Sequence, residues 1–222
     1  MPFSLYFPTP VLMVTPEEDV DNELENIQKE VEQSVVKIKE DDDYESLSDA
    51  SFDESKGTVF KRKSSLGIEF TSFANHVIAK YDMKSLTLYI QKYVQKYINT
   101  TEWSFLTDPR RSGQPYKIAM SDSWMNITRR ENFHHSHIHA HHSLSGVFYH
   151  KISKEMGGIT FRNPNQMISN MMFPEGPMSP NMITIVPDEG TLLLFPSWLQ
   201  HHTQKNDTDE ERITISFNID VF

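Results

Sequence analysis

From about residue 118 to the C-terminus, apolar residues alternate with a period of two, and this pattern limits the fold more than any other feature. Turn-forming pairs such as Gly157-Gly158 and Asn163-Pro164 divide the region into short segments. We predict strands at residues 117–128, 134–140, 144–152, 158–162, 182–187, 191–196 and 211–221. Many short strands in one run are typical of a β-sandwich or barrel.

The first half of the chain has helical periodicity after a short extended segment at residues 5–12. Apolar residues at helical spacing predict a helix from about 15 to 38 and a second from about 83 to 98. We therefore expect one α+β domain, in which residues 1–117 supply helices and residues 118–222 form the β-core.

Two segments are predicted to be loops. Residues 40–58 are acidic and serine-rich, and residues 163–182 hold five methionines and four prolines. The second loop is expected to be a substrate lid or a contact surface for a second copy or a viral protein, because methionine side chains adapt to varied surfaces.

Composition excludes several classes of function. Residues 17–54 contain 16 acidic and 3 basic residues, and no dense basic stripe follows, so we do not expect a nucleic-acid partner. The absence of cysteine excludes disulfides and thiolate zinc sites and fits a cytoplasmic location. The chain shows no signal-peptide pattern and no apolar run of about 18 residues, so no membrane partner is expected.

Histidines concentrate in the predicted β-core. Nine of the ten lie between residues 134 and 202, and seven of these between 134 and 150. On a strand, alternation would place His135, His137, His139 and His141 on one face, and His201-His202 follows near the end of the chain. Imidazole binds iron, zinc, copper and nickel, so the pattern predicts a metal centre without choosing the metal.

An arginine follows the last histidine pair. Arg212 and Thr214 share one face of the last predicted strand, and a planar guanidinium is suited to hold a carboxylate. We expect the polar turn at 205–210 to lay Arg212 antiparallel to the strand that ends at His201. Phe195 and Trp198 are expected to pack around that turn.

These residues carry a resemblance to a known family. The matching segments are Phe7-Pro8-Thr9-Pro10, Ser123-Trp124-Met125-Asn126, His137-Ile138-His139, Ser145-Gly146-Val147-Phe148-Tyr149, Phe195-Pro196-Ser197-Trp198-Leu199-Gln200-His201, and Arg212 through Asn218. The sequence resembles 2-oxoglutarate/Fe(II) oxygenases related to prolyl 4-hydroxylases, small proteins of marine bacteria and of phages of cyanobacteria.

The resemblance implies a double-stranded β-helix, a jelly-roll or cupin-like barrel, with Fe(II) in its mouth and 2-oxoglutarate as co-substrate. By position, His137 and His201 match the two histidine ligands and Arg212 matches the 2-oxoglutarate anchor. Asn126, Tyr149 and Thr214 are candidates to line the same pocket. The resemblance also implies that ascorbate can serve as reductant and that a small-molecule or peptidyl substrate is hydroxylated. If the protein is phage-encoded, we expect it in the host cytoplasm.

One residue departs from the usual pattern. The common motif is His-x-Asp/Glu, whereas His139 stands in the third position here, so we expect His137, His139 and His201 to hold the metal. His135 or His141 could replace His139, and His134, His142, His150 and His202 should lie elsewhere.

Two alternative functions stay open. One is a non-catalytic structural or assembly protein of a phage, and the other is a cupin-like three-histidine dioxygenase that does not use 2-oxoglutarate.

Overall fold

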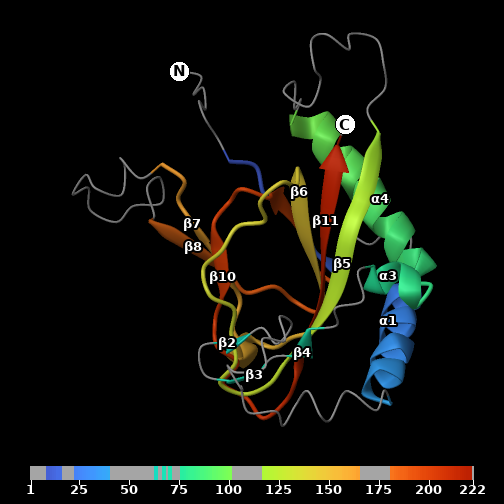
Figure 1. Cartoon of the computed structure of the whole chain (residues 1–222), viewed down its shortest axis with the longest axis vertical. Coiled ribbons are helices and arrows are strands. Elements are labelled where there is room, and N and C mark those ends of the chain that lie inside the picture. Colours follow the sequence, from blue (N-terminus) through green and yellow to red (C-terminus); the bar gives the residue numbers. More distant parts are fainter. Residues whose placement is uncertain are drawn as a thin grey trace, which may run out of the picture.

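The structure, a computed structural model, is built on a six-stranded sheet. The residues that it describes are 9–16, 23–40, 76–101, 117–165 and 181–221, with the main chain of three short strands at 63–64, 67–68 and 70–71. The sheet has the order β1-β9-β6-β11-β5-β4 and is antiparallel throughout (Figure 1). Its strands are β1 (Leu12–Val14), β4 (Phe70–Thr71), β5 (Ile118–Thr128), β6 (Leu144–Lys151), β9 (Leu192–Pro196) and β11 (Arg212–Val221).

A second sheet has the order β10-β7-β8 and is also antiparallel. It comprises β7 (Ile159–Arg162), β8 (Met182–Ile185) and β10 (His201–Thr203), and a 3₁₀ turn at Lys154–Met156 precedes β7. Strands β2 (Lys63–Ser64) and β3 (Gly67–Ile68) pair only with each other. A buried apolar cluster that includes Ile159 and Phe161 on β7 and Leu193 and Phe195 on β9 joins the two larger sheets. Two antiparallel sheets closed around a common interior confirm the predicted double-stranded β-helix.

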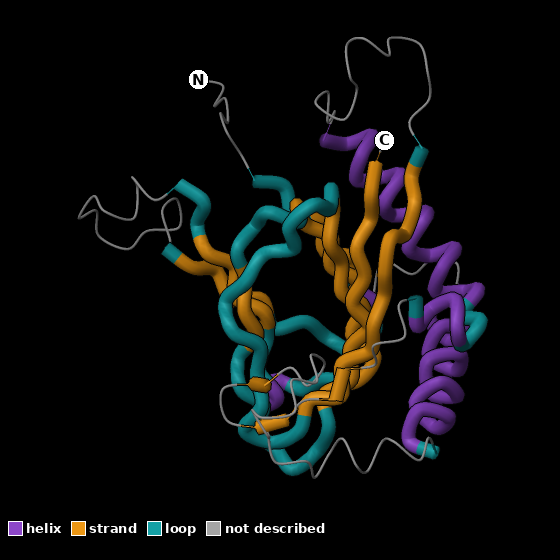
Figure 2. The backbone as a smooth tube through the Cα atoms, in the orientation of Figure 1, coloured by secondary structure: helices purple, strands orange, loops and turns teal. Residues whose placement is uncertain are grey.

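Helices cover the other face of the six-stranded sheet (Figure 2). They are α1 (Glu23–Lys39), α3 (Val77–Lys80) and α4 (Lys84–Thr101), and α1 and α4 confirm the two predicted helices. Their apolar stripes join the outward side chains of β5 and β11 in a second buried cluster. The carboxylate of Glu30 on α1 accepts the main-chain N–H groups of Ser85 (2.9 Å) and Leu86 (3.2 Å) and so caps the start of α4. None of the described helices has the length and apolarity needed to cross a membrane.

The strand predicted at 134–140 is wrong. His137 forms an isolated bridge with His201, but the next contact along the segment goes from His139 N–H to Ser197 O (2.9 Å). A regular antiparallel ladder would continue to residue 199, so the tight turn at Pro196–Leu199 breaks the pairing. Conversely, strand β10, which carries His201, was not predicted.

The predicted pairing of Arg212 with the His201 strand is also wrong. β11 pairs with β5 and β6 in the larger sheet, whereas His201 lies on β10 in the smaller one. The connection between them crosses from one sheet to the other because Asn206 anchors it. This side chain is fully buried and donates to Thr128 O (3.0 Å) and Glu210 O (2.7 Å). Residues 41–62, the acidic loop, and residues 166–180, most of the methionine-rich loop, lie outside the described residues.

Candidate metal centre

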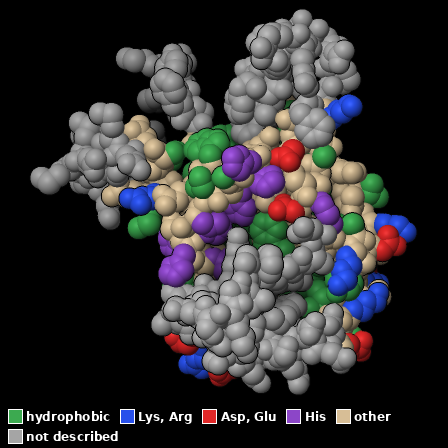
Figure 3. Space-filling model, in the orientation of Figure 1, with side chains coloured by type: hydrophobic (Ala, Val, Ile, Leu, Met, Phe, Trp, Pro, Cys, Tyr) green, Lys and Arg blue, Asp and Glu red, His purple; other side chains and the backbone are tan. Residues whose placement is uncertain are grey.

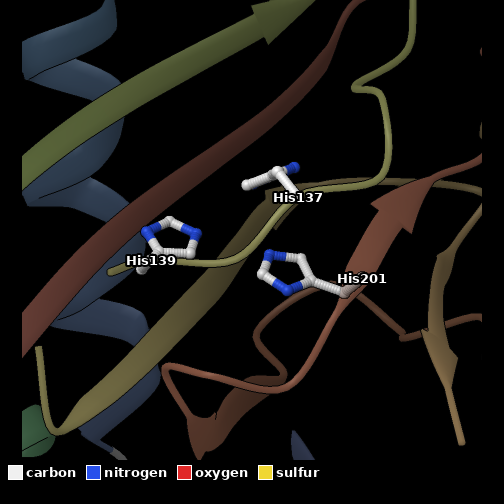
Figure 4. Close-up of side chains that lie close together, drawn as sticks. All are labelled: His137, His139 and His201. Carbon is white, nitrogen blue, oxygen red and sulfur yellow. The ribbon is translucent and has the colours of Figure 1, made fainter. Parts of the chain in front are cut away.

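Three histidines meet where the 134–143 segment passes β10. His137, His139 and His201 each offer a ring nitrogen, and these nitrogens lie within 4.8 Å of one another. The ring centroids of His201 and His137 are 4.4 Å apart, and those of His201 and His139 are 5.2 Å apart. In Figure 4 the three rings surround one point. The structure therefore brings together the three residues that the sequence suggested as ligands, although the first two do not lie on a strand.

Main-chain carbonyls fix the orientation of two of these rings. His137 Nδ1 lies 2.6 Å from His135 O, and His201 Nδ1 lies 2.8 Å from Leu199 O. A carbonyl only accepts, so each Nδ1 carries the proton and each Nε2 keeps its lone pair. A hydrogen bond of this kind at the second ring nitrogen is the usual support of a metal-binding histidine.

Burial keeps the deepest of the three rings neutral. His201 is 4% exposed, and its burial, with the nearby charge of His137, lowers its pKa to about 4. At neutral pH the ring is therefore unprotonated, as a metal ligand must be. Three convergent imidazoles fit iron, zinc, copper or nickel and do not suit magnesium or calcium, which prefer oxygen ligands. The donor set therefore fits the Fe(II) expected from the resemblance.

The other histidines take different places. Among the described residues, only the group of three meets the geometry of a shared ion, and His135 and His141 are exposed. His142 contacts Asp220, and His150 contacts Gln28 and Glu32 on α1. His134, which was expected elsewhere, lines the same cavity as the three ligands, with its ring 6.2 Å from that of His137.

Arg212 lines the same cavity as the three histidines and is 3% exposed. Its Nη1 donates to the carbonyls of Met156 (2.6 Å), Gln204 (3.0 Å) and Gly157 (3.2 Å), and its Nη2 donates to Thr203 Oγ1 (3.2 Å). These contacts hold the guanidinium in one orientation inside the barrel. A fixed cation at this place can bind a carboxylate that enters the cavity.

The remaining candidates line the same cavity. Thr214 stands on β11 next to Arg212, opposite Asn126 on β5 and Tyr149 on β6, and all three side chains are buried. Asn126 Nδ2 donates to Ser216 Oγ (3.0 Å) and Thr214 Oγ1 (3.3 Å). Burial raises the pKa of Tyr149 far above its usual value, so its phenol stays protonated and can donate a hydrogen bond.

Sequence reasoning assigned no role to three residues around the centre, Phe161, Trp124 and Thr203. Phe161 packs its ring against His201 at a centroid distance of 6.0 Å, beside Phe195 at 4.8 Å. Trp124 stacks on His139, and Thr203 links Arg212 to the main-chain N–H of His134. Phe195 packs in the core as expected, but Trp198 is 50% exposed because it stands at the tip of the turn before β10. Alternation along β5 could have found Trp124, since Asn126 was already a candidate on the same face.

Known structures have the same fold at low sequence identity. A prolyl hydroxylase from Trichoplax adhaerens, solved with a hypoxia inducible factor peptide fragment, is 13% identical, with a TM-score of 0.52 over 94% of this chain and 82% of that chain. A Pseudomonas putida prolyl-4-hydroxylase is 11% identical, with a TM-score of 0.51 over 96% and 92%. The non-heme epimerase SnoN from nogalamycin biosynthesis, in complex with Fe³⁺, alpha ketoglutarate and nogalamycin RO, is 12% identical, with a TM-score of 0.52 over 95% and 78%.

Sequence comparison points to the same group of proteins. No curated protein matches the sequence. Residues 122–218, from β5 through most of β11, match the family described as "Putative 2OG-Fe(II) oxygenase". This segment contains His137, His139, His201 and Arg212, and its sheets form the double-stranded β-helix described above. The match covers 97 of the 222 residues, and over this segment the chain is similar to the 2OG-Fe(II) oxygenase family.

Proposed function

We propose that this chain is a single-domain Fe(II)- and 2-oxoglutarate-dependent hydroxylase, in which His137, His139 and His201 bind the iron through Nε2 and Arg212 binds the far carboxylate of 2-oxoglutarate. The observation that carries the proposal is the arrangement of one cavity. Three convergent imidazoles and a buried guanidinium, held in one orientation by its hydrogen bonds, line this cavity together. Tyr149, Asn126 and Thr214 complete the co-substrate pocket with hydrogen-bonding groups.

When bound, Fe(II) and 2-oxoglutarate couple the reduction of O₂ to two oxidations, so that 2-oxoglutarate, O₂ and a C–H bond become succinate, CO₂ and a C–OH group. The chain binds and orients the reactants. His201 is neutral, and a main-chain carbonyl fixes the ring of His137, so both rings stay oriented toward the same point. The rings of Phe161 and Phe195 pack against His201 and exclude water behind it. His137, His139 and His201 would hold Fe(II) together, which would leave part of the cavity for the oxo acid beside Arg212.

The substrate is proposed only as a class, a small molecule or a peptidyl residue. Of the structures similar in fold, the T. adhaerens enzyme was solved with a peptide fragment and SnoN with nogalamycin RO, so both classes stay open. The proposal has further parts that rest on composition and resemblance. They are ascorbate as reductant, a cytoplasmic location, phage origin, and a contact with a second copy or a viral protein through residues 163–182.

The test is turnover of 2-oxoglutarate by the purified chain. Protein with Fe(II), 2-oxoglutarate and ascorbate should form succinate under air, even slowly and without the natural substrate. The His201→Ala variant should form none above the protein-free background, while His142→Ala, which changes a histidine bound to Asp220, should retain the activity. Equal succinate formation by wild type and His201→Ala would exclude this centre as the site.

One observation favours a second function. A third histidine in place of the usual carboxylate is also compatible with a three-histidine dioxygenase that oxidises its substrate without an oxo acid. Such an enzyme does not need a buried guanidinium in the cavity that the histidines line, so Arg212 favours the first proposal. O₂ consumption that is independent of 2-oxoglutarate would favour the second.

A further inference from the structure

Trp124 lies on the cavity side of β5, beside the metal ligands. Alternate residues Trp124, Asn126 and Thr128 line the cavity, while Met125 and Ile127 between them pack toward the helices. The indole is therefore directed into the barrel rather than into the main apolar cluster. A large aromatic ring at this place is available to contact the ligands themselves.

The rings of Trp124, His139 and His201 form a stack. The indole and the His139 ring are 5.6 Å apart and inclined by 21°, and the rings of His139 and His201 are 5.2 Å apart and inclined by 5°. His139 thus lies between an indole and the most buried ligand of the centre. Offset stacking at these separations is a favourable aromatic geometry.

We propose that Trp124 is a positioning residue that fixes the ring plane of His139, so that this third ligand points at the same ion as His137 and His201. Carbonyls orient the other two rings through Nδ1, and the indole restricts His139 by contact with the face of its ring. The inference rests on the proposed metal centre. It adds a support that a carboxylate ligand would not require, because a carboxylate has no ring to stack.

The test measures Ni(II) binding to tag-free apo-protein by calorimetry. Trp124→Leu should weaken binding about 10- to 100-fold, the usual effect of removing a group that orients a ligand. Trp124→Phe should return to within about fivefold of wild type, because a phenyl ring still stacks on imidazole. Trp198→Leu is the matched control, since Trp198 is half exposed and does not line the cavity, and it should bind as wild type does.

A second pair of variants separates positioning from a general loss of structure. In a His139→Asp background the third ligand remains but its ring is gone, so Trp124→Leu should change Ni(II) affinity by less than about threefold. An equal loss in both backgrounds, or no loss with His139 present, overturns the inference. Wild-type protein that does not bind Ni(II), or binds it equally well after His201→Ala, instead overturns the metal centre on which the proposed function depends.

Discussion

Among single residues, His139 has the largest chemical consequence. With three neutral imidazoles, a bound Fe(II) keeps its full charge of two, whereas a triad with a carboxylate lowers it by one. The described lining of the cavity contains Arg212 and no carboxylate. In the proposed centre a dianionic oxo acid would itself balance the charge of the metal, so its binding should depend strongly on nearby cations.

The first prediction concerns Arg212. With metal present, Arg212→Ala should weaken binding of 2-oxoglutarate by roughly 2–5 kcal/mol, because a buried carboxylate loses its charge-assisted partner. Arg129→Ala is the control, since Arg129 is partly exposed, is paired with Glu211 and does not line the cavity, and it should leave affinity unchanged. Calorimetric titration measures both variants, and unaltered Ni(II) binding shows that they are folded. Equal affinity of Arg212→Ala and wild type would remove the oxo acid from the proposal.

Among the elements, the turn at Lys154–Gly158 connects fold and site. It supplies Met156 O and Gly157 O to Arg212, and Gly157 adopts φ +73°, which side chains other than glycine rarely adopt. A Cβ at Gly157 would lie 2.7 Å from Lys205 O. The turn is therefore expected to control how the guanidinium is held.

The second prediction tests this turn. Gly157→Ala should lower the free energy of unfolding by about 1–3 kcal/mol and also weaken binding of 2-oxoglutarate. Gly190→Ala is a matched control, because Gly190 has φ +86° but a Cβ there would meet only side-chain atoms at 3.3 Å or beyond. It should lose stability without losing affinity. Urea denaturation and calorimetry distinguish the two, and equal losses of affinity would contradict the assignment.

The elements also show how far sequence could predict the fold. Period-two alternation found most of the strands and helical periodicity found α1 and α4, because both patterns follow from burying one face. The path of 134–143 and the crossing before Arg212 depend on tertiary contacts, namely His139 with Ser197 and Asn206 with Thr128. The three histidines that converge in the structure were nevertheless the ligand candidates of the sequence, although the strand pairing expected for two of them does not form.

Over the whole molecule, the buried apolar side chains form two separate clusters. One lies between the helices and the six-stranded sheet, and the other lies between the two sheets beside the metal centre. In Figure 3 the described histidines gather over one region of that face, and some acidic side chains lie beside them. The helical layer should therefore stabilise the barrel without contributing to the site.

The third prediction follows from this division. Leu86→Ala, at a fully buried position on α4, should lower the free energy of unfolding by about 2–5 kcal/mol and leave Ni(II) affinity unchanged below the transition. Leu88→Ala on the same helix, 63% exposed, should change stability by less than about 0.5 kcal/mol. A loss of metal affinity in folded Leu86→Ala would show that the two layers are coupled.

The most direct measurement is a crystal structure of the protein with Fe(II) and 2-oxoglutarate, prepared without oxygen. The account predicts one ion bound by Nε2 of His137, His139 and His201 at about 2.0–2.3 Å. It predicts the oxo acid on the same ion, with its far carboxylate against Arg212 and Tyr149. An ion bound without His139, or an oxo acid held away from Arg212, would contradict it.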